Sequence, residues 1–419
     1  MSHTASTQQR PVTPSRRTAM RPQAGARRHG IGFGLVAFAF LTAMAFSTVP
    51  TPLYPLYMAR DGFSTFMVTV VFAVYAVGVV VSLLLAGHVS DWVGRKKILL
   101  PALALELLAA VLFLSSSALP VLLAARFITG LGVGMITATA TAHLQELHAA
   151  HRPQASTQRF ELVSTGANIG GLGVGALVAG LLAQFVAVPL HTPYLVFAAL
   201  LVLALVAVAL SPETVEEQFV RPSYRPQRIS LDHGDRAGYL VAAAGAFASF
   251  AVFGLFTSVA PGFVAGTLHH PSRALAGAIV FMVFGGAATA QSLTSRLSTA
   301  AKSRLGQAAQ AVGVVTLVAG MHTAGLAAFL AGGVVAGIGA GVLFKASLGT
   351  VAALAVPEHR GEALAGLFLI AYLGLTLPAI GIGVATLGFS SVTVMTWFAG
   401  ILLAVLALIA LSGRRASLR

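Results

Sequence analysis

Few side chains in this 419-residue chain carry a charge, and a dense group of them follows Gly87. Asp91 and Arg95 are four residues apart, so the two side chains can pair if the segment is helical. Lys96 adds a second cation, and Gly94, like Gly87, allows a tight backbone turn or the close approach of a helix. The spacing predicts a charged turn whose ionic contacts form in one state of the molecule and break in another.

Two more charged residues are isolated in long apolar stretches. Glu106 is the only acid well within such a stretch, and Arg126 lies several residues inside another. A charge at such a place is costly and marks a candidate functional residue. Glu106 could pick up and release protons, or it could be neutral and hydrogen-bonded to a neighbouring helix. Arg126 could hold an anionic substrate or act on a nearby acid, or it could extend to a membrane surface.

Three uncharged polar side chains complete the candidates. Tyr54 and Tyr57 lie in the stretch 50–57, whose prolines should break a helix. They either line a gate or belong to the aromatic belt at a membrane surface. Asn168 begins the glycine-rich stretch 168–175, where small residues favour close helix packing.

The composition indicates what surrounds these residues. The chain is 57% hydrophobic and only 9% charged, whereas a soluble globular chain carries roughly 25% charged residues. Its apolar surface therefore needs lipid as a solvent. The net charge of +14 is spread over the segments between apolar stretches and does not form a basic domain, which argues against a nucleic-acid partner.

Metal and cofactor chemistry is not expected. The chain has no cysteine, which excludes disulfides and thiolate metal sites. His143, Glu146, His148 and His151 do not have the spacing of a metal-binding helix, and no phosphate-binding G-x-x-x-x-G-K-[ST] segment occurs. We expect no metal, no cofactor and no enzymatic activity.

The apolar stretches predict an all-helical membrane protein, since about 20 residues cross the bilayer as a helix. We expect about twelve spans, near residues 31–57, 65–87, 98–118, 119–143, 161–186, 194–211, 237–261, 274–295, 305–321, 325–348, 362–386 and 391–412. With this layout nearly all cations fall on one side, which predicts that both termini are cytoplasmic.

The two halves of the chain repeat each other weakly. The glycine triplet of the fourth span recurs in the tenth; its members are Gly130, Gly132 and Gly134, then Gly337, Gly339 and Gly341. The repeat predicts two pseudo-symmetric six-helix bundles, at 30–211 and 237–412, in which the glycines allow helices to pack closely. Residues 212–236 are expected to be a cytoplasmic linker, 1–29 a disordered basic tail, and 413–419 a short cytoplasmic tail.

The order of these features resembles the major facilitator superfamily. The segment Gly87-x-x-x-Asp91-x-x-Gly94-Arg95-Lys96 resembles the loop between its second and third spans, and Arg126-Phe127-Ile128-Thr129-Gly130 resembles its fourth-span arginine motif. The resemblance covers residues 30–412 and extends to bacterial drug-type exporters. It implies that the loop is a conformational latch, with the eleventh span as its neighbour and Glu146 as a second partner of Arg95. This chain departs from the family pattern at Trp92, where a basic residue is usual, and at Ala176, where the antiporter motif has proline.

The function expected from these features is secondary active transport by alternating access. We expect proton-driven efflux of small organic or drug-like molecules, with a proton-linked importer as the alternative and a non-transporting membrane receptor or enzyme as a remote one. The expected partners are a small-molecule substrate, protons and lipid. The protein is expected to be a monomer in the cell (inner) membrane.

Overall fold

The computed structural model describes residues 22–87, 89–215, 224–228, 235–356 and 359–416. Within these residues the chain is helical and contains no strand. Eleven helical segments are long and apolar enough to cross a membrane. The predicted all-helical membrane fold is therefore confirmed.

The first half of the chain supplies six spans. Their elements are α1 (Pro22–Thr48), η1 (Thr51–Leu53), α2 (Tyr54–Asp61), α3 (Thr65–Ala86), α5 (Arg95–Ser115), α6 (Leu119–His151), α7 (Gln158–Thr165), η2 (Gly166–Gly170), α8 (Gly171–Phe185) and α9 (Thr192–Leu210). A single short helix, α4 (Ser90–Val93), lies in the loop between α3 and α5.

The second half supplies six more helices of span length. Its elements are α10 (Arg236–Ser258), α11 (Ala260–Gly266), α12 (Arg273–Leu293), α13 (Thr299–His322), α14 (Leu326–Leu354), α15 (Arg360–Ala385) and α16 (Ser391–Ala416). Of these, α13 is the predicted ninth span, but it is not among the eleven apolar segments. Gln307 and Gln310 lower its hydropathy, although its 24 residues are enough for a span.

Local deviations from the predicted spans have physical causes. The first span breaks at Pro50 and continues as η1 and α2, as the proline-rich stretch predicts. The tail prediction for 1–29 is wrong at its end, because α1 begins at Pro22 and the carbonyl of Ala26 accepts a hydrogen bond from His151 Nδ1 at 2.7 Å. The remainder of that tail lies outside the described residues.

The two halves use their glycine triplets in the same way. A Cβ at Gly130 or Gly134 would meet the backbone of α3, and one at Gly132 would meet α5. In the second half, the corresponding positions Gly337 and Gly341 meet α12, and Gly339 meets α13. The fourth and tenth spans therefore pack on equivalent neighbours, as expected for two copies of one bundle.

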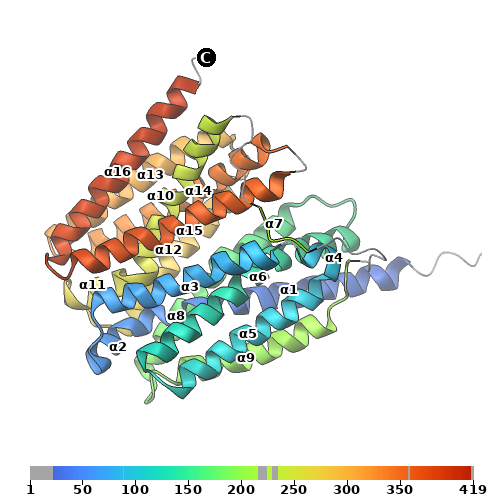
Figure 1. The fold of residues 1–419 in the computed structure, drawn as a ribbon, viewed down its shortest axis with the longest axis horizontal. Coiled ribbons are helices and arrows are strands. Elements are labelled where there is room, and N and C mark those ends of the chain that lie inside the picture. Colours follow the sequence, from blue (N-terminus) through green and yellow to red (C-terminus); the bar gives the residue numbers. More distant parts are fainter. Residues whose placement is uncertain (1–21, 88, 216–223, 229–234, 357–358, 417–419) are drawn as a thin grey trace, which may run out of the picture.

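The bundle has two distinguishable ends. We call the end with α4, Arg95, Lys96 and the linker the basic end; α2 and α11 lie at the opposite end (Figure 1). Figure 1 shows the second half, yellow to red, lying on the first half, blue to green. Across this seam α3 packs on α15, and α8 packs on α12.

Candidate functional site

A network of charged side chains joins four segments at the basic end. Arg95 donates to Asp91 at 2.5 Å within the turn and to Glu146 of α6 at 2.6 Å. Only 8% of the Arg95 side chain is exposed, and Arg95 Nη1 also donates to Ser90 Oγ at 2.7 Å. The structure thus brings together Asp91, Arg95 and Glu146, and the basic group is fixed from three directions.

Glu213 belongs to the same network, although the sequence did not single it out. Its carboxylate accepts hydrogen bonds from the backbone N–H groups of Arg95 and Lys96, both at 3.0 Å, at the first turn of α5. A carboxylate at a helix N-terminus satisfies free N–H donors and the positive end of the helix dipole. The next residue, Thr214, donates to Glu146. The start of the linker therefore closes the network, which we call the latch network: Asp91, Arg95, Glu146 and Glu213.

The electrostatics of Glu213 follow from these contacts. Burial raises the pKa of its carboxyl, but the backbone hydrogen bonds from Lys96, Arg95, Thr214 and Val215 outweigh burial, so the pKa lies below its usual value. Glu213 is therefore a stable anion at neutral pH. It could have been noticed in the sequence, because it is an acid placed directly after Ser211-Pro212 at the end of the sixth predicted span.

Two other members of the predicted latch are placed as turn residues. Gly94 has φ of +117°, a backbone conformation that side-chain-bearing residues rarely adopt. Lys96 donates from Nζ to the carbonyl of Ala209 at 2.7 Å, next to the end of α9. The Asp91 side chain is 63% exposed, and its ionic partner among the described residues is Arg95, four residues further along the chain. Gly87 lies at the end of α3.

Inside the first half, Glu106 is completely buried. It lies on α5 against Gly132 of α6, where an added Cβ would come within 2.5 Å of Glu106 Oε1. Neither carboxylate oxygen has a hydrogen-bond partner among the described residues. An ionised carboxylate in such surroundings is unfavourable by several kcal/mol, so this position favours the protonated form.

The second half has a neutral residue at the equivalent position. Gly339 of α14 packs on Gln310 and Gly306 of α13, as Gly132 of α6 packs on Glu106 and Ala102 of α5. Gln310 is also fully buried, and its Nε2 donates to the carbonyl of Ala248 at 2.6 Å. The two halves therefore match in geometry at this point but differ in whether the side chain can carry a proton.

Arg126 lies in the interior of the first half and does not extend to a surface. It is 1% exposed, and its Nη1 donates to the carbonyl of Ser47 on α1 at 2.7 Å. Its guanidinium carbon is 4.5 Å from the centre of the Tyr75 ring, which is a favourable cation–π distance. No ion pair joins Arg126 to an acid within the described residues, although its charge acts on the nearby Glu106 carboxyl.

The two candidate tyrosines are both buried. Tyr54 is 3% exposed and Tyr57 is 2% exposed, so neither belongs to a lipid-facing belt. The Tyr57 hydroxyl lies 3.2 Å from that of Tyr194 on α9. The Tyr54 hydroxyl has no partner among the described residues. Arg126, Glu106 and Tyr54 are thus buried polar groups of one half-bundle that retain unsatisfied atoms.

Asn168 falls in a π-helical turn, η2, that the sequence did not reveal. This turn interrupts the fifth span between α7 and α8 and packs against α1 and α12. A π-turn inside a helix often occurs at a functional site. Asn168 itself is partly buried.

The seam widens from the opposite end toward the basic end. At the opposite end, Gly180 of α8 lies against Gly277 of α12, where an added Cβ would be 3.0 Å from the Gly277 Cα. Further along, the Cβ position of Gly173 is 3.1 Å from the backbone of Phe281. Next to the basic end, Cβ positions at Gly166 and Gly285 meet nothing within 4 Å.

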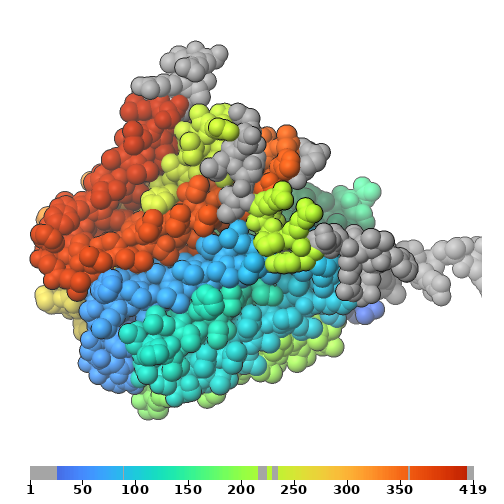
Figure 2. Space-filling view, in the orientation of Figure 1, coloured from blue at the N-terminus to red at the C-terminus, as the bar shows by residue number. Residues whose placement is uncertain are grey.

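Other contacts agree with closure at the opposite end. Thr51 Oγ1 donates to the carbonyl of Thr257 at 3.0 Å in a buried position. Arg273 donates from its backbone to Gln184 Oε1 at 2.9 Å. At the basic end, residues 224–228 of the linker lie across the end of α3, where Gln227 N–H donates to the Leu84 carbonyl at 2.8 Å (Figure 2). The two halves are therefore in contact at the opposite end, and the seam between α8 and α12 is wider toward the basic end.

An aromatic cluster in the second half was not found from the sequence. It consists of Phe250, Phe344, Phe368 and Tyr372, whose ring centres follow one another at 4.9 to 5.9 Å. The rings come from α10, α14 and α15 and are only partly buried. The sequence shows these residues as unremarkable apolar positions, because their convergence depends on the packing of three helices.

No group of histidine or acidic side chains suitable for a metal ion occurs in the described part of the chain. His143, which the sequence places near Glu146, is buried, and its Nε2 lies 3.0 Å from the carbonyl of Pro212. His148 contacts the carbonyl of Ser156. These contacts are structural ones between α6 and neighbouring segments.

Two six-helix halves of membrane-spanning helices, with a charged network at one end, are the architecture of a membrane transporter. Residues 36–305 match the family model of the Major Facilitator Superfamily. This chain belongs to that superfamily. No curated protein sequence matches it.

Several solved transporters share the fold. The human organic anion transporter MFSD10 (TETRAN) is similar with a TM-score of 0.65 and 16% identity, over 91% of this chain and 99% of that one. A POT family transporter in complex with a thioalcohol-conjugated peptide gives a TM-score of 0.72 at 13% identity, over 93% and 96%. The nucleoside transporter NupG gives 0.68 at 14% identity, over 91% and 99%. At these identities the likeness establishes the fold alone.

Proposed function

We propose that this protein is a proton-driven exporter of small, weakly charged organic molecules. Membership of the superfamily makes it a membrane transporter of the major facilitator type. Export is supported by the resemblance of the chain, within the superfamily, to bacterial drug-type exporters. The distribution of cations predicts that the basic end is cytoplasmic, so the wider part of the seam faces the side from which an exporter takes up its substrate.

The observation that carries the proton coupling is the burial of Glu106. Its carboxyl is 0% exposed and lacks hydrogen-bond partners among the described residues, so a negative charge there is unstable while the surroundings stay as they are. Loss of the proton requires a rearrangement that brings water or a cation to the carboxylate. Arg126 of the neighbouring α6 is the cation buried in the same half-bundle. Proton release is thereby tied to a conformational change.

The aromatic cluster supports an amphipathic substrate. By resemblance to the superfamily, spans 1, 4, 7 and 10 line the central cavity, and Phe250 and Phe344 lie on the seventh and tenth. Partly exposed rings offer apolar contact and stacking without a formal charge. A highly charged substrate such as a sugar phosphate is less suited to these spans, because they carry few charges.

The decisive variant is Glu106→Gln, since it mimics the protonated carboxyl. Gln310 occupies the equivalent place in the second half, so this substitution is compatible with folding. We expect Glu106→Gln to abolish proton-gradient-driven accumulation in proteoliposomes, assayed with a panel of fluorescent amphipathic dyes, while dye counterflow without a gradient persists. Gln310→Ala, at the matched position, should leave the dependence on the gradient intact. Uphill, pH-dependent accumulation by Glu106→Gln equal to that of the wild type would contradict the role of Glu106.

A proton-linked importer remains the alternative, because the same machinery can run in the other direction. Direction is measured in everted membrane vesicles energised to acidify their interior. An exporter accumulates its substrate in these vesicles, whereas an importer accumulates it only in right-side-out vesicles.

The latch network is proposed to break and re-form during the cycle. In the described state Asp91 is largely exposed, so it is free to meet the N-terminus of α15 when the basic end closes. Asp91→Asn should therefore reduce transport strongly with little loss of folded protein. Normal transport by a well-expressed Asp91→Asn protein would contradict this role.

A further inference from the structure

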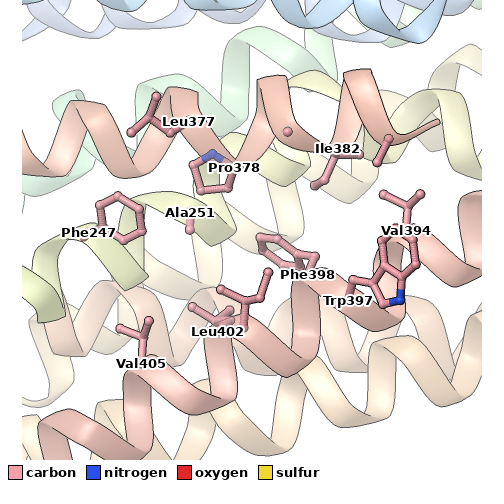
Figure 3. Close-up of a pocket in the computed structure, with 13 residues that line it drawn as sticks. Phe247, Ala251, Leu377, Pro378, Ile382, Val394, Trp397, Phe398, Leu402 and Val405 are labelled. Atoms are coloured by element: carbon pink, nitrogen blue, oxygen red, sulfur yellow. The ribbon is translucent and has the colours of Figure 1, made fainter. Parts of the chain in front are cut away.

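A large apolar cavity lies away from the seam, on the outside of the second half. It has a volume of about 330 Å³ and lies between α10, α15 and α16. Figure 3 shows Phe247 and Ala251 of α10 on one side, Leu377, Pro378 and Ile382 of α15 on another, and Phe398 and Trp397 of α16 facing them. Every side chain that lines it is apolar, apart from the indole N–H of Trp397.

The packing of the three helices explains why a gap remains. The backbones of α15 and α10 touch at Gly374, where an added Cβ would clash with the carbonyl oxygen of Phe247. Pro378 follows four residues later inside α15, where a proline ring disturbs the straight course of a helix. The start of α16 is tied to α13 instead, through His322 Nε2 and Thr396 Oγ1 at 3.0 Å.

The cavity opens to the side of the protein that the bilayer covers. Its floor is buried, with Ala251 2% and Leu402 3% exposed. Its rim is exposed, with Leu377 54% and Ile401 68% exposed. Both helices of the rim are membrane-spanning segments, so the medium at this opening is lipid hydrocarbon. The cavity is therefore continuous with the lipid-facing surface.

Its length matches one half of a bilayer. On α16 the lining runs from Val394 to Val405, a rise of about 16 Å at about 1.5 Å per residue. The hydrocarbon core is ~30 Å thick, so one leaflet contributes about half of that. Trp397 lies near the start of α16 at the opposite end of the bundle, and tryptophan favours the level of the lipid headgroups.

We propose that this cavity binds one acyl chain of a phospholipid from the leaflet at the opposite end of the bundle. The chain enters between α15 and α16 and rests on Ala251 and Phe398. The bound lipid rests against Phe247 and Ala251 of α10, the helix that also carries Phe250 of the aromatic cluster. The site is independent of the proposed proton coupling and of the direction of transport.

Tryptophan fluorescence tests the proposal directly, because the chain contains only two tryptophans. In the Trp92→Phe protein, Trp397 is the single tryptophan. We titrate the detergent-purified, delipidated protein with phosphatidylcholine whose acyl chains carry bromine, a contact quencher. Trp397 should be quenched at about one lipid per protein. The reference is Ala319→Trp in a protein lacking both natural tryptophans, since Ala319 is exposed on α13 one turn before His322, which meets Thr396 next to Trp397. Quenching of this reference tryptophan should need many more lipids per protein.

A filled cavity should abolish this early quenching. Gly381 lines the cavity, and a Cβ there meets nothing within 4 Å, so Gly381→Leu can enter the space without a backbone clash. Gly388→Leu adds the same side chain in the turn that follows the end of α15. Gly388 does not line the cavity, so this variant should leave the quenching of Trp397 unchanged. Ala385→Leu is a second filling variant in case Gly381→Leu folds poorly, as judged by size-exclusion chromatography. The proposal is overturned if Trp397 needs as much lipid as the reference, or if both filling variants leave its quenching unchanged.

Discussion

Arg126 is held by two contacts of different geometry. It donates to the Ser47 carbonyl at 2.7 Å while its guanidinium plane covers the Tyr75 ring at 4.5 Å. A lysine keeps the charge but lacks the planar fork that makes both contacts at once. The identity of the side chain, and not only its charge, should therefore matter.

We accordingly expect Arg126→Lys to lower gradient-driven transport at least tenfold. The loss of a buried hydrogen bond to a charged group should also lower the free energy of unfolding by about 1–3 kcal/mol. Transport in proteoliposomes and thermal unfolding measure the two effects separately. Wild-type transport by Arg126→Lys would mean that charge alone is sufficient at this position.

The seam and the bundle interiors are built from helices that approach through glycine. At Gly130 an added Cβ would lie 2.1 Å from the carbonyl oxygen of Tyr75, so α3 and α6 would have to separate. At Gly166, in the π-turn, the same Cβ meets nothing within 4 Å. A side chain therefore cannot be added at Gly130 without moving the helices, whereas at Gly166 there is room for one.

Gly130→Ala should destabilise the protein by about 1–3 kcal/mol, the usual cost of overpacking. Gly166→Ala should leave the melting temperature within about a degree or raise it slightly, because alanine is the better helix former. Thermal unfolding in detergent compares the two proteins under identical conditions. Equal losses of stability would show that the distance at Gly130 does not control the packing of α6.

Glu213 ties the linker to α5 and makes the stability of this helix sensitive to acid. The pKa of Glu213 is lowered in the folded protein, so its stabilising effect is complete above the ordinary pKa of a glutamate, near 4.3. The effect is lost as the pH falls through the lower folded-state pKa. The sensitive range is therefore below about pH 4.5.

Glu213→Gln should lower the free energy of unfolding at pH 7 by about 1 kcal/mol, as for other lost helix caps. Its melting temperature should also fall less than that of the wild type between pH 6 and pH 3. Glu362→Gln, in the first turn of α15, is the matched control for removal of an acid at a helix start. A wild-type pH profile in the Glu213→Gln protein would assign the acid sensitivity to other groups.

The sequence predicted those elements whose causes are local. Long apolar runs define the spans. The four-residue spacing of Asp91 and Arg95 predicted their ion pair because the two are close in the chain, although the helix is broken between them at Gly94. Glu213 escaped detection because it meets Arg95 across 118 residues of chain. The equivalence of Glu106 and Gln310 could not be seen in the sequence, because one residue type is acidic and the other is neutral. In addition, the number of residues between these two positions differs slightly from the number between the two glycine triplets. The aromatic cluster depends on packing between α10, α14 and α15, which no local pattern encodes.

At the scale of the whole molecule, the widening seam predicts how the halves move. The chain has no cysteine, so any disulfide cross-link must come from a pair of cysteines that is introduced. Ser272 Oγ and Gln184 Oε1 are 3.5 Å apart at the closed end, whereas Gly166 and Gly285 line the open part of the seam.

We expect Gln184→Cys with Ser272→Cys to cross-link readily in the described state. Gly166→Cys with Gly285→Cys should cross-link only when the basic end closes, so its yield should rise as the yield of the first pair falls. Oxidative cross-linking at several pH values and substrate concentrations measures both. Yields of the two pairs that rise and fall together would contradict rocking of the halves about the seam.

The second half has the neutral Gln310 where the first half has the carboxyl of Glu106. This difference limits the substrate concentration gradient that the carrier can maintain. Within the described chain Glu106 is the one fully buried carboxyl, so the proposed cycle exchanges a single proton for each uncharged substrate. One elementary charge crossing a potential of 100 mV releases about 2.3 kcal/mol. Since about 1.4 kcal/mol corresponds to a factor of ten in concentration, this potential alone sustains a substrate ratio of about 50 across the membrane. The presence of one buried carboxyl in the first half and none at the matching position of the second half thus limits how strongly the substrate can be accumulated. A glutamate at position 310 is the simplest change that raises this limit.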